Sequence, residues 1–217
     1  MGPIREINLT DAVQKREELA NTLTHAAGVV ASIAALVTLT MLAARTGDAW
    51  KVVSVVVFGS TLILLYLAST LYHAATSLRI KARLKVLDHA AIYLLIAGSY
   101  TPFTIGALRG GWGWSLFGVV WGLAVLGVTF KLFFTGRFRL ASTLLYITLG
   151  WIALVAAGPL IRQLHPGVLI WLAAGGVAYT AGTPFYQRGR FRYAHAVWHT
   201  FVLAGSACHV VAVGLLI

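Results

Sequence analysis

The stretch "YAHAVWHTFVLAGSACHVVAVGLLI", residues 193–217, decides the class of fold. It contains no Asp, Glu, Lys or Arg, and about 20 apolar residues in a helix are enough to cross the hydrocarbon core of a bilayer. It nevertheless carries His195, His199 and His209. An ionisable side chain inside a membrane-spanning segment marks a functional site by default. The stretch therefore predicts a membrane protein with a site built into its last helix.

Six further apolar stretches of similar length precede this one. We place the seven spans at roughly 21–44, 50–76, 86–107, 112–131, 140–161, 167–185 and 193–217. With 59% hydrophobic and only 11% charged residues, the chain is more apolar than a soluble domain of 217 residues needs to be. The expected fold is an all-α integral membrane protein, a seven-helix bundle. A single domain covers residues 21–217, preceded by a polar cytoplasmic segment over residues 1–20.

The formal net charge is +11, which in a soluble protein would suggest a nucleic-acid partner. In a membrane protein it indicates loops that face the anionic cytoplasmic leaflet, so we expect no nucleic-acid binding. Thirteen of the 17 Lys and Arg residues fall in the N-terminal segment and the second, fourth and sixth loops. The positive-inside rule then predicts a cytoplasmic N-terminus and an external C-terminus.

With this orientation, nearly all intramembrane ionisable residues gather in one layer beneath the cytoplasmic surface. His73 ends the second span, Asp88 begins the third, and His195 and His199 begin the seventh. Asp88 is the only acidic residue after Asp48. Because a lone carboxylate in a bilayer needs a partner, a cation or a metal-bound water is the natural candidate.

The spacing of His195 and His199 places both imidazoles on one face of a helix, as zinc sites use them. His73 at the same depth offers a third ligand and leaves one tetrahedral position open, the pattern of catalytic zinc. Alternatively, His195 and His199 form a pair at a helix interface, or their spacing arises by chance. His209 lies ten residues further on, about 15 Å deeper, and is expected to be a packed or hydrogen-bonded neutral histidine.

Two further groups of polar residues lie near this layer. Ser69 stands four residues before His73 and shares its helix face. Glu18, Asn21 and His25 follow the spacing i, i+3, i+7 and form one helical stripe. This stripe could support the metal ligands or form a gate. Alternatively, it could be a row of polar side chains that faces inward at a hydrated helix end.

Four motifs resemble those of the hemolysin III family, in order and on the corresponding spans. They are "EELANTLTHAAG" (17–28), "STLYHAA" (69–75), "LDHAAIYLLIAGSYTPF" (87–103) and "HAVWH" (195–199). That family is the bacterial branch of the progestin and adipoQ receptors, and the wider superfamily includes alkaline ceramidases. The resemblance implies a bacterial inner-membrane protein with Zn²⁺ held by His73, His195 and His199. The resemblance also places Asp88 beside the zinc-bound water. It matches Ser69 and His73 to the Ser-xxx-His motif of that superfamily.

The favoured function is zinc-dependent hydrolysis of an amide or ester bond in a lipid, near the cytoplasmic leaflet. Zinc lowers the pKa of bound water from ~15.7 to ~7. Asp88 would orient that water or take its proton, and Ser69 would bind Asp88 or polarise the substrate carbonyl. The expected partners are membrane lipids and a lipid-like substrate or ligand.

One alternative function is that of a non-enzymatic sensor or regulator of membrane state with structural zinc. The other is a pore-forming cytolysin, although the polar groups occupy one layer rather than a continuous face.

Overall fold

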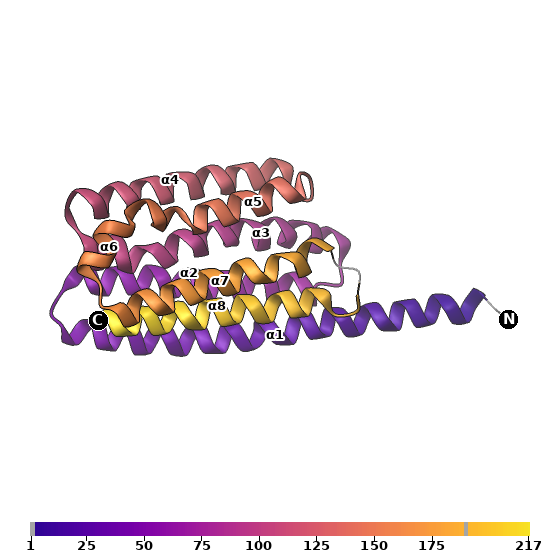
Figure 1. Cartoon of the computed structure of the whole chain (residues 1–217). Helices are drawn as coiled ribbons and strands as arrows, with labels where there is room; N and C mark the ends of the chain where they lie inside the picture. Colours follow the sequence, from indigo (N-terminus) through magenta and orange to yellow (C-terminus); the bar gives the residue numbers. More distant parts are fainter. Residues whose placement is uncertain (1–2, 189–190) are drawn as a thin grey trace.

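A computed structural model describes residues 3–188 and 191–217, and all of its regular elements are helical (Figure 1). They are α1 (Pro3–Arg45), α2 (Ala49–Ala74), α3 (Leu78–Thr101), the π-helix η1 (Pro102–Leu108), α4 (Gly110–Phe134), α5 (Arg139–Gly150), the 3₁₀ helix η2 (Ile152–Ala156), α6 (Ala157–Gln163), α7 (Pro166–Arg188) and α8 (Ala194–Leu216). The described residues contain seven helical stretches that are long and apolar enough to cross a membrane, which confirms the predicted number of spans.

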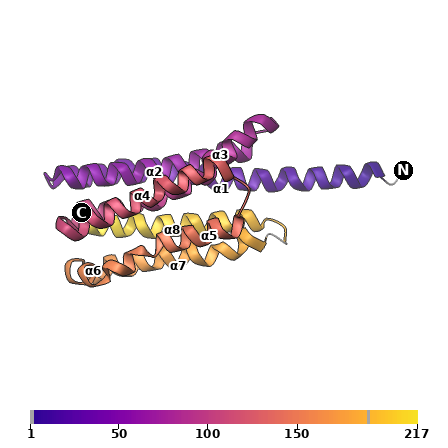
Figure 2. The ribbon, with the colours of Figure 1, turned by 90° about the horizontal axis from the view of Figure 1, so that it is seen from above.

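The helices run along one common axis, with the two ends of the chain at opposite ends of the bundle (Figure 1). α1 packs against α2 and α8, α2 against α3, α3 against α4, and α7 against α8. Seen from the second direction, α1, α2 and α3 form one side of the bundle and α7 and α8 lie on the other (Figure 2). The α2–α3 and α4–α5 connections, the last turn of α7 and the first turn of α8 all lie at the end where α1 enters the bundle (Figure 1).

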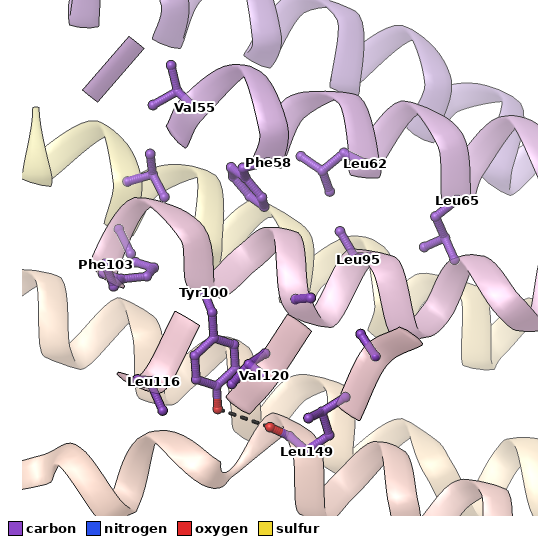
Figure 3. Packing of buried hydrophobic residues seen from close by; sticks show 14 of the residues in the cluster. Val55, Phe58, Leu62, Leu65, Leu95, Tyr100, Phe103, Leu116, Val120 and Leu149 are labelled. Atoms are coloured by element: carbon purple, nitrogen blue, oxygen red, sulfur yellow. Dashed lines mark hydrogen bonds between the residues drawn. The ribbon is translucent and has the colours of Figure 1, made fainter. Parts of the chain in front are cut away.

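A cluster of buried apolar side chains joins α2, α3 and α4 (Figure 3). Phe58 and Leu62 of α2 face Leu95 of α3, and Val120 of α4 is fully buried on the other side. The hydroxyl of Tyr100 donates a hydrogen bond to the Leu149 carbonyl over 3.1 Å, which ties α3 to the end of α5 (Figure 3).

Two helices begin earlier than the spans predicted from hydropathy. α1 starts at Pro3 instead of near residue 21, and α3 starts at Leu78 instead of near residue 86. The basic residues expected in the second loop therefore lie on the first turns of α3. The physical reason is that "LRIKARLK" (78–85) consists of good helix formers, and hydropathy measures the membrane crossing rather than the helix.

The fifth span is not one continuous helix as its length suggested. α5 ends at Gly150, a 3₁₀ segment follows, and α6 begins at Ala157. Pro159 lies in the first turn of α6, where its missing N–H costs little, but its ring prevents a continuous α-helix through the preceding residues. A similar effect ends α3, because Pro102 has no N–H to donate and the chain continues as the π-helix η1.

Candidate metal centre and adjoining cavity

Three histidines from two helices converge near the end of the bundle where α1 enters. His73 lies in the last turn of α2, while His195 and His199 lie on successive turns at the start of α8. One ring nitrogen from each can be chosen so that all three atoms lie within 4.8 Å of one another. The centroids of the His195 and His199 rings are 4.6 Å apart. This spacing allows one metal ion to contact all three imidazoles.

The tautomer of His73 is fixed by Glu18 of α1. Nδ1 of His73 lies 3.0 Å from Oε2 of Glu18, and a carboxylate can only accept, so Nδ1 carries the proton and donates it. The other nitrogen, Nε2, is buried and has no hydrogen-bond partner among the described residues. A buried lone pair without a partner is costly, and a metal ion would satisfy it. The same Glu18 carboxylate also accepts from Lys81 Nζ at 2.8 Å.

Thr24 of α1 fixes the ring of His199 in the same way. The single hydrogen of its hydroxyl is shared between the backbone carbonyls of Ala20 and Asn21, each of which lies 2.9 Å from the hydroxyl oxygen. The hydroxyl oxygen therefore accepts the proton on His199 Nδ1, 3.0 Å away, which leaves Nε2 of His199 as a lone pair. Two of the three histidines are thus set in the protonation state that a metal ligand needs.

The predicted stripe of Glu18, Asn21 and His25 faces this centre. The His25 ring is stacked on His199 with 3.5 Å between centroids and 13° between planes. His25 and Asn21 are both buried, and the described residues offer no partner to either nitrogen of His25 or to the Asn21 side-chain oxygen. α1 therefore supplies contacts to two of the clustered histidines, although it supplies no member of the cluster itself.

A cavity of about 490 Å³ opens beside the histidines and runs along α3 from Asp88 to Phe103. Its polar end is formed by Asp88, Ser69, His195 and His199, and its remaining walls are mainly apolar. The Ser69 hydroxyl is buried and makes no hydrogen bond within the described chain. Asp88 is half-buried and lines the cavity. The structure thus brings both predicted catalytic residues to the same cavity as two of the predicted ligands.

The other histidines of the described chain lie outside the cluster. His209 lines the cavity away from the cluster, and its Nδ1 lies 2.8 Å from the Gly205 carbonyl. His89 also lines the cavity, with Nδ1 bound to the Lys85 carbonyl at 2.7 Å and Nε2 accepting from the Tyr186 hydroxyl at 3.2 Å.

The sequence reasoning missed three residues around the centre. They are Thr24, Lys81 and Tyr186. For Thr24 a signal was available, because it follows Asn21 by three residues and so lies beside the polar stripe. Lys81 and Tyr186 form hydrogen bonds with residues of other helices, and no local sequence pattern predicts these contacts.

Comparison with known proteins identifies the family to which the chain is similar. The family profile described as "Haemolysin-III related" matches residues 13–210. The "Hemolysin-3 homolog" of Bacillus subtilis (strain 168) is 47% identical over 192 residues, which cover 88% of this chain and 90% of the relative. "Hemolysin-3" of Bacillus cereus is 46% identical, with 88% of each chain covered. The "Monocyte to macrophage differentiation factor" of Homo sapiens is 28% identical over 91% of this chain and 83% of the relative. No solved structure matches the chain.

Proposed function

Since this chain belongs to the haemolysin-III related family of membrane proteins, we propose that it is a zinc-dependent hydrolase of an amide or ester bond in a membrane lipid. One observation carries the proposal. The cluster of His73, His195 and His199 lies beside a largely apolar cavity in which Asp88 is the only carboxylate among the described lining residues. A metal site, a base and room for a hydrocarbon chain therefore lie together.

The donor set supports zinc as the metal. Three imidazole nitrogens suit Zn²⁺ and leave one position of a tetrahedron for a reactant, as in catalytic zinc sites. A zinc ion in this cluster would supply Lewis acidity, which polarises a carbonyl group and makes water a stronger acid near neutral pH.

The protein's own part begins with holding the ligands. Glu18 keeps the proton of His73 on Nδ1, and Thr24 keeps that of His199 on Nδ1. Such partners orient a ligand ring and raise its basicity, and losing one typically costs ~10–100-fold in metal affinity. The centre therefore depends on α1 as well as on the helices that carry the histidines.

Asp88 and Ser69 would act on the substrate. Both reach the cavity where His195 and His199 also line it. The Asp88 carboxylate would take a proton from the attacking water, and general-base groups of this kind contribute ~10²–10⁴-fold to the rate. The Ser69 hydroxyl lies at the same polar end of the cavity and would donate to the carbonyl oxygen of the scissile bond.

The cavity would take the acyl chain of the lipid. Its volume of about 490 Å³ lies within the range of ~300–1,000 Å³ typical of ligand sites. Its apolar walls would exclude water from the hydrocarbon while the polar end receives the linkage to be cut. From the distribution of Lys and Arg, we place the polar end just beneath the cytoplasmic surface of the bacterial inner membrane.

A second candidate is a sensor or regulator in which zinc has a structural role. The hydrogen bonds that Glu18 and Thr24 accept from His73 and His199 favour it, because with a metal ion in this cluster α1, α2 and α8 would be tied together. The name of the Bacillus cereus relative, "Hemolysin-3", suggests a third candidate, a cytolysin. The cavity supports this reading least, since a pore needs polar residues along its full length and those here gather mainly near the histidines.

The deciding experiment is lipid mass spectrometry on the purified protein. Zinc-loaded and chelator-treated samples are incubated with a panel that includes ceramides and diacyl phospholipids. We expect a free fatty acid to be released from one lipid class by the zinc-loaded sample alone. A protein that carries full zinc and releases no product from any lipid would favour the regulatory role instead.

A further inference from the structure

The part of the cavity away from the clustered histidines contains an acceptor atom with no partner. The hydroxyl groups that line it are already engaged. Ser99 donates to the Ile96 carbonyl at 2.8 Å, Thr180 to the Gly176 carbonyl at 2.8 Å, and Tyr179 shares a hydrogen bond of 2.8 Å with Ser206. His209 differs from them, because only one of its two ring nitrogens has a partner among the described residues.

The protonation of the His209 ring follows from its neighbours. Nδ1 lies 2.8 Å from the Gly205 carbonyl, which can only accept, so Nδ1 carries a proton. No carboxylate in the described part of the chain pairs with the ring. A charged imidazole without a counter-ion is costly inside a membrane protein, so the ring is neutral. Nε2 is then a lone-pair acceptor on a residue that lines the cavity.

The ring is also held in place before any ligand binds. A side-chain carbon at Gly175 would lie 2.3 Å from Nδ1 of His209, so the absence of a side chain there lets the imidazole lie against α7. The Tyr179 ring packs beside it with 5.5 Å between centroids. An acceptor whose direction is fixed in advance loses little entropy when a donor reaches it.

We propose that His209 selects lipids that carry a hydroxyl group in the middle of the hydrocarbon chain, with Nε2 accepting the hydrogen bond. This inference rests on the proposed function in one respect, namely that a lipid chain fills the cavity. His209 lies ten residues from His199 on the same helix, about 15 Å along the axis. The favoured hydroxyl therefore lies about 15 Å from the polar end of the cavity.

The chemistry of the acceptor narrows the class of ligand. A plain alkyl chain would cover Nε2 and leave it without a partner, which is unfavourable for a buried polar atom. A keto or ether group offers only acceptors and would fare no better. A hydroxyl is the smallest group that supplies a donor while the rest of the chain stays apolar.

The test is a binding competition with the full-length, zinc-loaded protein in detergent. A fluorescent fatty-acid probe is displaced by octadecanoic acid and by its monohydroxy derivatives, substituted next to the carboxyl, at mid-chain or at the terminal carbon. We expect the mid-chain derivative to bind roughly three- to tenfold more tightly than the parent acid, as one hydrogen bond allows. His209→Leu should remove this preference. Ser99→Ala, which deletes a hydroxyl already bonded within its own helix, should keep it.

Three results would overturn the inference. The first is a wild-type protein that binds all four acids equally, in which case His209 only packs or holds water. The second is a mid-chain preference that survives in His209→Leu, which would place the acceptor elsewhere. The third is no displacement of the probe by any acid. Hydrolysis is decided separately by the lipid panel, so a clear mid-chain preference without product release would support this inference and count against the proposed enzyme.

Discussion

Oε2 of Glu18 lies 3.0 Å from Nδ1 of His73, and this hydrogen bond connects α1 to the end of α2. It joins a carboxylate to a buried imidazole whose other nitrogen, Nε2, is left without a partner among the described residues. A carboxylate behind a histidine is a common arrangement around protein-bound zinc, where it fixes the ring and strengthens its lone pair. The two residues are 55 positions apart in the sequence, so the contact exists only because the helices pack as they do.

The first prediction concerns this carboxylate. Glu18→Gln removes the negative charge and should weaken zinc binding by ~10–100-fold, with the protein still folded. Competition with a chromophoric chelator measures the affinity. Glu17→Gln is the matched control, because Glu17 accepts from the backbone N–H of Tyr193 instead and glutamine can still do so. Equal affinities in the two variants would contradict the role of Glu18.

The second prediction concerns the metal itself. Elemental analysis of the purified protein should find close to one zinc per chain, and His195→Ala should lower this value sharply because only two imidazoles of the cluster are left. His209→Ala serves as the control and should retain the metal, because its ring is bonded to the Gly205 carbonyl outside the cluster. Full retention of zinc in His195→Ala would show that the ligands are different.

The third prediction separates chemistry from architecture. Asp88→Asn keeps the size of the side chain but cannot act as a base, so lipid hydrolysis should fall by ~10²–10⁴-fold. Zinc content and thermal stability should stay near the wild-type values, because Asp88 is not among the three clustered residues. Asp48→Asn, between α1 and α2, is the control and should keep full activity. A loss of hydrolysis that merely follows a loss of zinc would indicate a structural role for Asp88.

The fourth prediction concerns orientation. The excess of Lys and Arg on one side predicts that the C-terminus lies outside the cytoplasm. A reporter that is active only in the cytoplasm should therefore be silent when fused after Ile217. The same reporter on the α2–α3 connection, at the opposite end of the bundle, should be active. The reverse pattern would move the histidine cluster to the external side.

The fifth prediction concerns acid. Asp48 caps α2 by accepting from the backbone N–H of Trp50 at 2.9 Å, and it also pairs with Arg109. The hydrogen bond from the Arg109 guanidinium is the main cause that lowers the pKa of the Asp48 carboxyl. A carboxyl with a lowered pKa stabilises the folded state above its ordinary pKa, and this contribution is lost as the pH falls through the lowered value. Thermal unfolding should show a small deficit for Asp48→Asn at neutral pH that disappears in acid. A deficit of constant size would exclude this ion pair as its source.

Hydropathy and spacing were enough to predict the number of spans and the clustering of the three histidines. The i, i+4 pair of His195 and His199 needed only the geometry of one helix. His73 could be added because short loops force neighbouring spans to alternate in direction, which sets its depth. These inferences hold because the backbone groups of a chain inside a bilayer must form internal hydrogen bonds, which restricts membrane-spanning segments to helices and closed barrels.

Other features depend on contacts that no local pattern encodes. Thr24 and His199 are 175 residues apart, and their hydrogen bond requires the first and last helices to be neighbours. The early start of α3 was missed because charged helix formers lower hydropathy without ending a helix. The break between α5 and α6 had a signal in Gly158 and Pro159, but hydropathy alone gives these residues little weight.

α1 has a mechanical consequence that follows from its length. Its 43 residues span ~65 Å, about twice the thickness of the hydrocarbon core, and its first turns project beyond the bundle (Figure 1). The same continuous helix carries Glu18 and Thr24 further along its length, where both contact the clustered histidines. A shift of α1 by one turn, ~5.4 Å, would break both of these hydrogen bonds at once. A displacement of α1 along its axis would therefore reach His73 and His199 together.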